Sequence, residues 1–401
     1  MTDASKSAAS SSAQQFRPVW AEVDLDAVRD NVRNLLAMAL PAALLAVVKA
    51  DGYGHGAVPV AEAALEAGAS WLGVALVEEG IALRNAGIDA PVLVLSEQPA
   101  AAAPAIVAHR LTPIVYTTNG IDALAKAVAD AGGSEPLPVH LKVDTGMHRV
   151  GCAPEDARRL ADAVAARTEL VLEGVCTHFA VADDPAHPST SEQIRTFESV
   201  LEALAEGGHR PPVVHASNSA GLLAHPTARY DLVRCGIAIY GIPPGPAVAD
   251  AAALRPSLSL KARVAHVKEL PAGSRLSYGL RYELGRDGRV ATIPIGYADG
   301  VARNLGLAGG QVLIRGRRFP IAGTVTMDQL MVDLGVDADG DELGVGNEVE
   351  VGDEVVLLGR QGSEEITAEE WAARLGTIAY EIPTGIGVRV PRHYLHGDRT
   401  P

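Results

Sequence analysis

The chain has 401 residues, of which 48% are hydrophobic and 21% are charged, an ordinary balance for a globular protein with a sizeable core. Its formal net charge of −15 argues against a nucleic-acid-binding surface, which would be basic. Its three cysteines, Cys152, Cys176 and Cys235, form no CxxC pair, so they indicate neither a zinc site nor a disulfide framework and fit a reducing cytoplasm.

The amino-terminal residues 1–16 are mostly small and polar. They contain no apolar h-region, so we expect no secretory signal and predict a disordered tail. No apolar run in the sequence approaches the roughly 18–20 residues that span a bilayer, so we expect no membrane partner.

Eight short runs rich in β-branched residues follow, and each is succeeded by an Ala/Leu/Glu-rich stretch of helical period. The runs are continuously apolar rather than alternating, which is typical of parallel strands buried on both faces. They occupy residues 42–49, 71–76, 91–96, 111–116, 138–144, 170–179, 212–218 and 231–240. This pattern predicts an α/β fold, a (β/α)8 TIM-type barrel over residues 17–255.

The pattern changes near residue 250, and from Leu260 onward short strand-like pieces alternate with Gly- and Pro-containing turns. Only residues 366–376 have a helical pattern. We therefore predict a mostly β carboxy-terminal domain over residues 256–401. The alternating segment 19–25 could pair with that domain.

Catalytic groups of such barrels lie at the carboxyl ends of the strands. The polar residues that end the runs are therefore the candidates for chemistry: Lys49, Lys142, Arg149, His178, Asn218, Ser219 and Arg234. Lys49 ends an apolar run, where desolvation favours the neutral amine that a Schiff-base nucleophile needs. Tyr53 offers a hydroxyl nearby, and Gly52, Gly54 and Gly56 would allow a ligand close to the backbone.

A dinucleotide-binding interpretation of the same segment also exists. Gly52-x-Gly54-x-x-Ala57 follows a predicted strand, and Glu78 and Glu79 end the next one, as in a Rossmann fingerprint. The count of eight strands favours the barrel.

A phosphate site is expected after the seventh and eighth strands, where barrels commonly bind phosphate. The backbone N–H groups of Gly236 and Ile237 and the hydroxyl of Ser219 suit such a site. Other roles stay open at this point: Ser219 could cap a helix, Arg234 could pair with a surface carboxylate, and His178 could be structural.

No metal site is predicted. Asp337, Asp339, Asp341 and Glu348 partly resemble a calcium loop, but Glu342 stands where that loop requires glycine. We interpret this segment as a solvated acidic turn.

Several motifs, taken together and in order, resemble the alanine racemase family over about Trp20 to Arg392. They are AVVKADGYGHG (46–56), KVDTGMHRVG (142–151), CTHFAVAD (176–183), HASNSA (215–220), DLVRCGIAIYG (231–241), LSYG (276–279), PIGYADG (294–300) and TVTMDQ (324–329). The family combines a barrel that binds pyridoxal 5′-phosphate (PLP) with a β domain, in agreement with the domains predicted above.

The resemblance implies a homodimer with PLP as cofactor and with a site shared between subunits. Lys49 would be the Schiff-base lysine and one catalytic base, and Tyr278 the opposite base, delivered from the partner subunit. The remaining implied cofactor contacts are Arg234 at the pyridine nitrogen, His178 against the ring, Arg149 at the phenolic oxygen, and Tyr53, Ser219, Gly236 and Ile237 at the phosphate; Asn218 is also expected to bind the cofactor.

The resemblance also implies substrate contacts. Arg149 and Met327 would bind the substrate carboxylate, and Tyr297, Arg303 and Asp328 would lie along the access route. Lys142 matches a lysine that is carbamylated in many members.

Two positions depart from the family pattern. His148 stands where many relatives have glycine. Val388 stands where some relatives have a phosphate-binding tyrosine, which puts one phosphate contact in doubt.

The implied reaction is the interconversion of L- and D-alanine, which supplies D-alanine for peptidoglycan. Inversion needs a base on each face of the substrate, and a cationic Arg234 and His178 near Tyr278 would favour its phenolate. An arginine at the pyridine nitrogen weakens the electron sink and suppresses side reactions. The alternatives are a related PLP decarboxylase, which places an acid there, a broader-specificity racemase, a PLP-carrying homeostasis protein and, remotely, a dehydrogenase.

Overall fold

The structure is a computed structural model that describes residues 16–132, 135–335 and 348–396. The predicted tail, apart from Phe16, and the acidic turn at 337–342 lie outside the described residues. The chain divides into two compact units. One contains Glu22–Leu258, Ala379–Thr384 and Tyr394–Pro401, and the other contains Met1–Ala21, Ser259–Ile378 and Gly385–His393.

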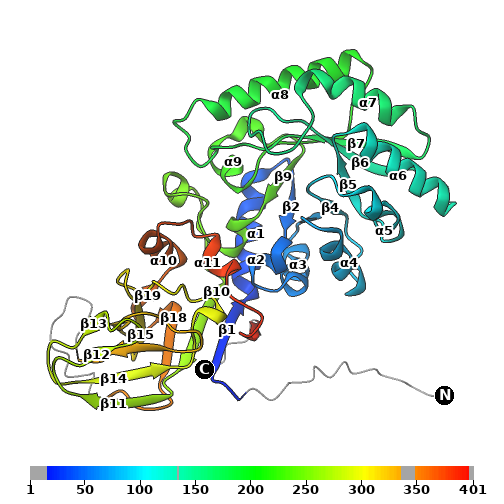
Figure 1. Cartoon of the computed structure of the whole chain (residues 1–401). Coiled ribbons are helices and arrows are strands. Elements are labelled where there is room, and N and C mark those ends of the chain that lie inside the picture. The colour runs from blue at the N-terminus through cyan, green and yellow to red at the C-terminus, as the bar shows by residue number, and fades with distance from the viewer. Residues whose placement is uncertain (1–15, 133–134, 336–347, 397–401) are drawn as a thin grey trace, which may run out of the picture. The chain divides into compact units, whose positions relative to one another are not determined.

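The first unit is built on an eight-stranded parallel sheet in the order β8-β7-β6-β5-β4-β3-β2-β9 (Figure 1). Its strands are β2 (Ala43–Val47), β3 (Trp71–Val74), β4 (Val92–Val94), β5 (Thr112–Val115), β6 (Leu137–Lys142), β7 (Leu170–Cys176), β8 (Val213–His215) and β9 (Leu232–Cys235). Between β8 and β9, the Asp231 N–H donates to the Val214 carbonyl at 3.0 Å. The sheet is thus a nearly closed barrel, and each of the eight predicted runs supplies one strand, so the predicted fold is confirmed.

Helices lie outside the strands of this unit (Figure 1). They are α1 (Leu25–Ala39), α2 (Lys49–Tyr53), α3 (Ala57–Glu66), α4 (Val77–Asn85), α5 (Ala103–Ala108), α6 (Thr118–Ala131), α7 (Ala157–Ala165), α8 (Ser189–Glu206) and α9 (Ser219–Ala224), with α11 (Glu381–Thr384) joining from the end of the chain. Helix α1 begins where the Asp24 carboxylate accepts from the Asp26 and Ala27 N–H groups, and it buries Val28, Val32 and Leu35.

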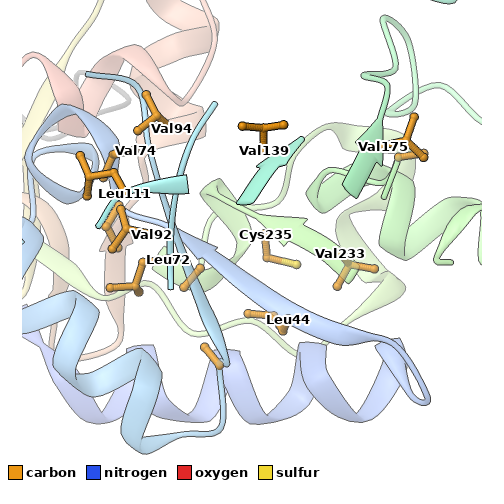
Figure 2. Packing of buried hydrophobic residues seen from close by; sticks show 14 of the residues in the cluster. Leu44, Leu72, Val74, Val92, Val94, Leu111, Val139, Val175, Val233 and Cys235 are labelled. Atoms are coloured by element: carbon orange, nitrogen blue, oxygen red, sulfur yellow. The ribbon is translucent and has the colours of Figure 1, made fainter. Parts of the chain in front are cut away.

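The alternation of side chains along each strand divides the barrel into two layers. The outward residues pack against the helices in one large cluster, which includes Leu44, Val139 and Val233 (Figure 2). A smaller cluster, which includes Leu45, Val47 and Leu232, comes from the intervening positions. By this alternation Lys49 follows Leu45 and Val47, and Arg234 follows Leu232, so both side chains belong to the barrel interior.

The second unit is mostly β, as predicted. Its larger sheet has the order β16-β15-β18-β10-β1-β20, with β19 paired to β18. These strands are β1 (Val19–Asp24), β10 (Leu258–Arg263), β15 (Gln311–Ile314), β16 (Arg317–Pro320), β18 (Glu354–Gln361), β19 (Glu364–Ile366) and β20 (Arg392–Leu395). A second sheet orders β11 (His266–Leu270), β14 (Gly288–Ile293) and β17 (Leu330–Asp333), while β12 (Arg275–Leu276) pairs with β13 (Tyr282–Glu283).

Two expectations about this unit are met. The early segment 19–25 does supply a strand, β1, to the larger sheet. The predicted helix at 366–376 is α10 (Ala368–Leu375), which begins where the Thr367 hydroxyl accepts from the Glu370 N–H. None of the helices among the described residues has the length and apolar character of a membrane span.

Candidate active site

A cavity of about 280 Å³ lies in the barrel unit, lined largely by residues at the carboxyl ends of the strands. Its wall contains all seven polar residues that end the predicted runs. The lining residues are Val47, Lys49, Tyr53, Leu95, Ile114, Lys142, Arg149, Cys176, Thr177, His178, Asn218, Ser219, Arg234, Gly236, Ile237 and Tyr380. The structure therefore brings all seven of these side chains together around one cavity.

A left-handed turn follows Lys49 immediately. Ala50, Asp51 and Gly52 all have φ and ψ between 44 and 61°, a conformation that costs an ordinary residue roughly 1–2 kcal/mol. The Glu79 carboxylate holds this turn, because it accepts from the Ala50 N–H at 2.6 Å and from the Ala75 N–H at 2.8 Å. Glu79 is thereby engaged by the protein backbone, and the eight strands follow barrel order rather than Rossmann order, so the dinucleotide interpretation is wrong.

The glycines of this segment serve the chain itself rather than a ligand. Gly52, Gly54 and Gly56 all have positive φ, and none of them lines the cavity. A methyl group on Gly54 would overlap the Pro383 carbonyl of α11. The expectation that these glycines admit a ligand was wrong, because the close neighbours of Gly54 and Gly56 are Pro383 and Tyr394 of the returning chain and that of Gly52 is Ala57.

The Lys49 amine has its pKa lowered, first by burial and then by the positive charge of Arg149, although Glu79 opposes the shift. A lower pKa enlarges the neutral fraction of the amine near neutral pH. Lys49 is therefore suited to attack a carbonyl carbon and afterwards to accept a proton.

Arg234 is almost completely buried, at 5% exposure, and does not pair with a surface carboxylate. Its Nη1 donates to His215 Nδ1 at 2.8 Å, and its Nη2 donates to the carbonyls of Thr177 and Ala216, both at 2.8 Å. Nη2 has two hydrogens, so its third contact, with His178 Nδ1 at 3.1 Å, shares one of them with a carbonyl. Among the described residues no group accepts from Nε, so that N–H remains for a ligand in the cavity.

His178 is neutral, contrary to the expectation of a second cation. Burial, followed by the charge of Arg234, holds the pKa of His178 well below its usual value. Its Nδ1 accepts from an arginine that can only donate, so the proton of the neutral ring is on Nε2. Arg234 is the cation of this pair.

Hydroxyl and amide groups converge at the start of α9 and after β9. The Asn218 side chain caps α9 by accepting from the Gly221 N–H at 2.9 Å, so the capping role considered for Ser219 belongs to Asn218. The Ser219 hydroxyl instead accepts from the Gly236 N–H at 3.0 Å and keeps its own proton to donate. A Cβ on Gly236 would lie 2.5 Å from Tyr53 Oη, which places that phenol against the same backbone.

Lys142 and Arg149 add two further cations to the wall. Burial is the largest cause of a lowered pKa at Lys142, and Arg234 and Arg149 also lower it. Among the described residues, neither side chain makes a hydrogen bond or an ion pair. Asp144, two residues after Lys142, accepts from the Gly146 and His148 N–H groups, both at 3.0 Å, and does not pair with Lys142.

His148 departs from the family's glycine and still has the backbone conformation that glycine favours, with φ of 57°. The Asp144 carboxylate compensates, since it binds the His148 N–H and lies 3.6 Å from the ring Nδ1. Histidine is among the non-glycine residues that adopt this conformation more readily.

The remaining candidate residues lie in the second unit, where backbone contacts link their motifs. The Tyr297 N–H donates to the Thr326 carbonyl and the Ala298 N–H to the Met327 carbonyl, at 2.9 and 3.0 Å. Thr324 Oγ1 donates to the Tyr278 carbonyl at 3.0 Å. The Val325 N–H donates to the Arg303 carbonyl at 3.1 Å. The side chains of Tyr278, Met327 and Tyr297 are 70%, 52% and 40% exposed.

Asp328 differs from its neighbours, because its carboxylate forms an ion pair with Arg389 at 2.7 Å.

Within the described part of the chain, no group of three His, Cys, Asp or Glu side chains could hold a metal ion.

Tyr380 is one of six cavity residues that the sequence analysis did not identify, with Val47, Leu95, Ile114, Cys176 and Thr177, and the expected position of a phosphate-binding phenol was misplaced. Tyr380 lines the cavity, with its ring centroid 6.4 Å from that of Tyr53, and burial is the largest cause of its raised pKa. Val388, which we associated with a missing phosphate-binding phenol, is 99% exposed. The signal that could have identified Tyr380 is its place in the segment YEIPTG, just before the returning helix α11.

The two units match two known families. Residues 23–244 match the family described as alanine racemase, N-terminal domain, and residues 257–394 match alanine racemase, C-terminal domain. The chain is 51% identical to an alanine racemase of Symbiobacterium thermophilum, over 94% of this chain and 97% of that protein.

Solved structures give the same result. The chain is similar to the alanine racemase of the D-cycloserine-producing Streptomyces lavendulae, with a TM-score of 0.88 and 42% identity over 96% of this chain and 98% of the other. A histidine racemase of Leuconostoc mesenteroides is more distant, with a TM-score of 0.84 and 29% identity over 96% and 99% of the two chains. These matches favour a racemase over the decarboxylase, carrier and dehydrogenase alternatives.

Proposed function

Because the chain belongs to the alanine racemase family and is an enzyme that interconverts L- and D-alanine, we propose that it works with PLP held covalently on Lys49. One observation carries this proposal. The barrel cavity combines a lysine of lowered pKa with a buried arginine that has a free donor and with a cluster of hydroxyl and amide groups.

The cavity fits the group that the family implies. Its volume of about 280 Å³ is just below the ≈ 300–1,000 Å³ typical of small-molecule sites. Four basic side chains line it (Lys49, Lys142, Arg149 and Arg234), which suits an anionic phosphate and a substrate carboxylate. We assign the phosphate to Tyr53, Ser219, Gly236, Ile237 and Tyr380, with Asn218 positioning Ser219 as the cap of α9.

PLP, when bound, withdraws electrons from the substrate α-carbon and so acidifies its proton. Lys49 Nζ takes or returns that proton on one face, and Oη of Tyr278 of the partner subunit does so on the other. Arg149, with Met327 of the partner subunit, binds the substrate carboxylate, and the neutral His178 ring packs against the cofactor. Tyr297, Arg303 and Asp328 line the access route.

Arg234 controls how strongly electrons are withdrawn. Its Nε–H points to no protein acceptor among the described residues, so it can donate to the pyridine nitrogen. A guanidinium stays protonated and cannot accept that nitrogen's proton, and its charge disfavours a protonated ring. The resulting weak electron sink favours proton return over transamination.

We further propose that the enzyme is a cytoplasmic homodimer that supplies D-alanine for peptidoglycan. The family match supports this, together with the exposed Tyr278 and Met327 side chains, which would be covered in a shared site. A broader-specificity racemase is the second candidate, because a histidine racemase shares the fold. Comparison of kcat/KM for L-alanine, L-serine and L-histidine decides between them.

Borohydride reduction followed by peptide mapping tests the cofactor assignment. We expect the mass of reduced PLP on the peptide that contains Lys49 and none on the peptide that contains Lys142. Lys142 is a matched internal control, because it is the other lysine of the cavity and also has a lowered pKa. Label on Lys142, or label on neither peptide, would contradict the proposal.

Lys142 is the second residue whose chemistry we propose. Two cations about 4 Å apart repel by roughly 4 kcal/mol at an effective dielectric constant of about 20, and Lys142 shares the cavity wall with Arg149 and Arg234. Its neutral amine can react with CO2 to give a carbamate and release a proton. The carbamate carries −1 and would hold Arg149 by a charge-assisted hydrogen bond.

Lys142→Ala is therefore expected to lower kcat/KM by about ten- to a hundredfold, the usual cost of losing a hydrogen bond to a charged group. A small carboxylate or chloride in the buffer should restore part of the loss. Lys126→Ala, at an exposed lysine of α6 paired with Asp130, is the control and should leave activity unchanged. Absence of a ¹³C carbamate signal from Lys142 in active enzyme equilibrated with ¹³CO2 would rule out the modification.

A further inference from the structure

A line of polar side chains crosses the barrel interior behind Arg234. His215 of β8 accepts from Arg234 at Nδ1, and its Nε2 lies 2.8 Å from His140 Nδ1. His140 of β6 continues the line, because its Nε2 lies 3.2 Å from Glu173 Oε2 on β7. Both imidazoles are 0% exposed, and the line ends at a half-buried carboxylate.

The direction of every hydrogen bond in this line follows from its first member. An arginine can only donate, so His215 Nδ1 carries no proton and the ring proton is on Nε2. That Nε2–H must donate to His140, whose Nδ1 is consequently also an acceptor. His140 Nε2–H then donates to the carboxylate of Glu173. All three bonds are satisfied by one arrangement in which both histidines are neutral.

The charges agree with that arrangement. Burial holds the pKa of His215 well below its usual value, and the charge of Arg234 adds to this. Burial likewise lowers the pKa of His140, against the opposing effect of Glu173. Among the described residues no carboxylate contacts Arg234, so Glu173 is the acid that its hydrogen-bond network reaches.

A β-bulge in β7 places the Glu173 carboxylate next to His140. Val139 of β6 pairs with Leu172, but the next residue, His140, pairs with Gly174, so Glu173 is an extra residue in the register. Leu172 and Val175 both pack in the outer layer, and two residues lie between them where strict alternation allows one. Bulges re-aim side chains in this way and are rare between parallel strands.

Gly174 makes room for the hydrogen-bonded chain Arg234–His215–His140–Glu173, which we call the relay. A Cβ at this position would lie 2.5 Å from His140 Nδ1 and 2.6 Å from its Cε1. The ring of His140 therefore packs directly on the Gly174 backbone. The bulge at Glu173, the missing side chain at Gly174 and the orientation of the His140 ring therefore all favour the hydrogen bond between His140 and Glu173.

We propose that Glu173 is a positioning residue that acts on Arg234 through His140 and His215. The relay fixes both histidines as neutral Nε2–H tautomers and holds the guanidinium so that its Nε–H faces the cavity. Its effect on catalysis rests on the proposed function, in which Arg234 meets the pyridine nitrogen, but the relay itself does not.

The relay is tested by ¹⁵N NMR of the full-length purified enzyme labelled at histidine. We expect His140 and His215 to be protonated at Nε2 alone throughout the active pH range. Glu173→Met removes the acceptor at similar volume and should shift the resonances of both rings. Glu169→Gln is the charge control, since its side chain makes no bond among the described residues, and it should shift neither ring. A shift confined to His140, or an Nδ1–H proton on either ring, would overturn the relay.

The catalytic consequence has its own readout. Glu173→Met should lower kcat about tenfold, the usual effect of an unsatisfied buried donor, while KM for alanine stays unchanged. The amount of pyruvate formed per alanine racemised should rise, and Glu173→Gln, which can still accept from His140, should restore most of kcat. An unchanged pyruvate ratio in a folded Glu173→Met enzyme would refute the positioning role. If reduced PLP is not found on Lys49 while the tautomers are as expected, the relay stands and the cofactor proposal fails.

Discussion

Lys49→Ala is expected to lower kcat/KM for alanine racemisation by at least about 10³-fold, because a positioned general base alone contributes ~10²–10⁴-fold. On the proposed function, the substitution removes the amine that would hold the cofactor and the base that would act on one substrate face. Alternation along β2 directs Lys49 into the barrel. The Glu79 carboxylate accepts from the Ala50 N–H and so fixes the backbone of the turn that follows Lys49. Racemisation in both directions, measured by chiral chromatography, gives the effect.

Two controls make this result interpretable. Lys126→Ala removes an exposed lysine and should match the wild type. Far-UV circular dichroism and size-exclusion chromatography should show that Lys49→Ala is folded and assembled. An added small amine should return part of the activity. Near-normal turnover by Lys49→Ala without any added amine would show that another group performs the chemistry.

Mixing two inactive variants, Lys49→Ala and Tyr278→Phe, is expected to regenerate activity if each site uses Lys49 of one chain and Tyr278 of the partner subunit. One site of a hybrid dimer then carries both substitutions and the other carries neither. With equal amounts and random exchange, about half of the dimers are hybrid, so activity per chain should approach about one quarter of the wild-type value.

The appropriate comparison for that mixture is Lys49→Ala mixed with the Lys49→Ala/Tyr278→Phe double variant, which has no intact combination and should stay inactive. Hybrid formation is verified independently with differently tagged chains. Tagged hybrids that form and remain inactive would place Lys49 and Tyr278 of the same chain in one site and remove the shared-site proposal.

The sequence alone determined the barrel fold and which polar residues at the strand ends line its cavity. Continuous apolar runs can be buried on both faces only in a covered parallel sheet, and the polar residue that ends each run must then lie at one rim. Lys49, Lys142, His178 and Arg234 were found in this way, and the cavity contains all four. The period of two along a strand is local, so it can be followed without knowing the fold.

The tertiary structure decided what depends on neighbours distant in sequence. The charge of His178 could not be predicted, because it follows from burial and from contact with Arg234, 56 residues away. Asn218 rather than Ser219 caps α9 because the helix begins at Ser219, whose hydroxyl instead accepts from the Gly236 amide after β9. Tyr380 reaches the cavity only because α11 returns to the barrel unit.

The register of β7 shows the same limit most clearly. In the sequence, Glu173 follows Leu172 as an ordinary strand residue, and strict alternation gives no reason to pair it with His140. One extra residue in the pairing with β6 turns its carboxylate into the barrel, where His140 and His215 connect it to Arg234. The alternation of side chains is a property of one strand and can be followed in the sequence. A bulge depends on how two strands pair, so the relay arises only in the assembled sheet.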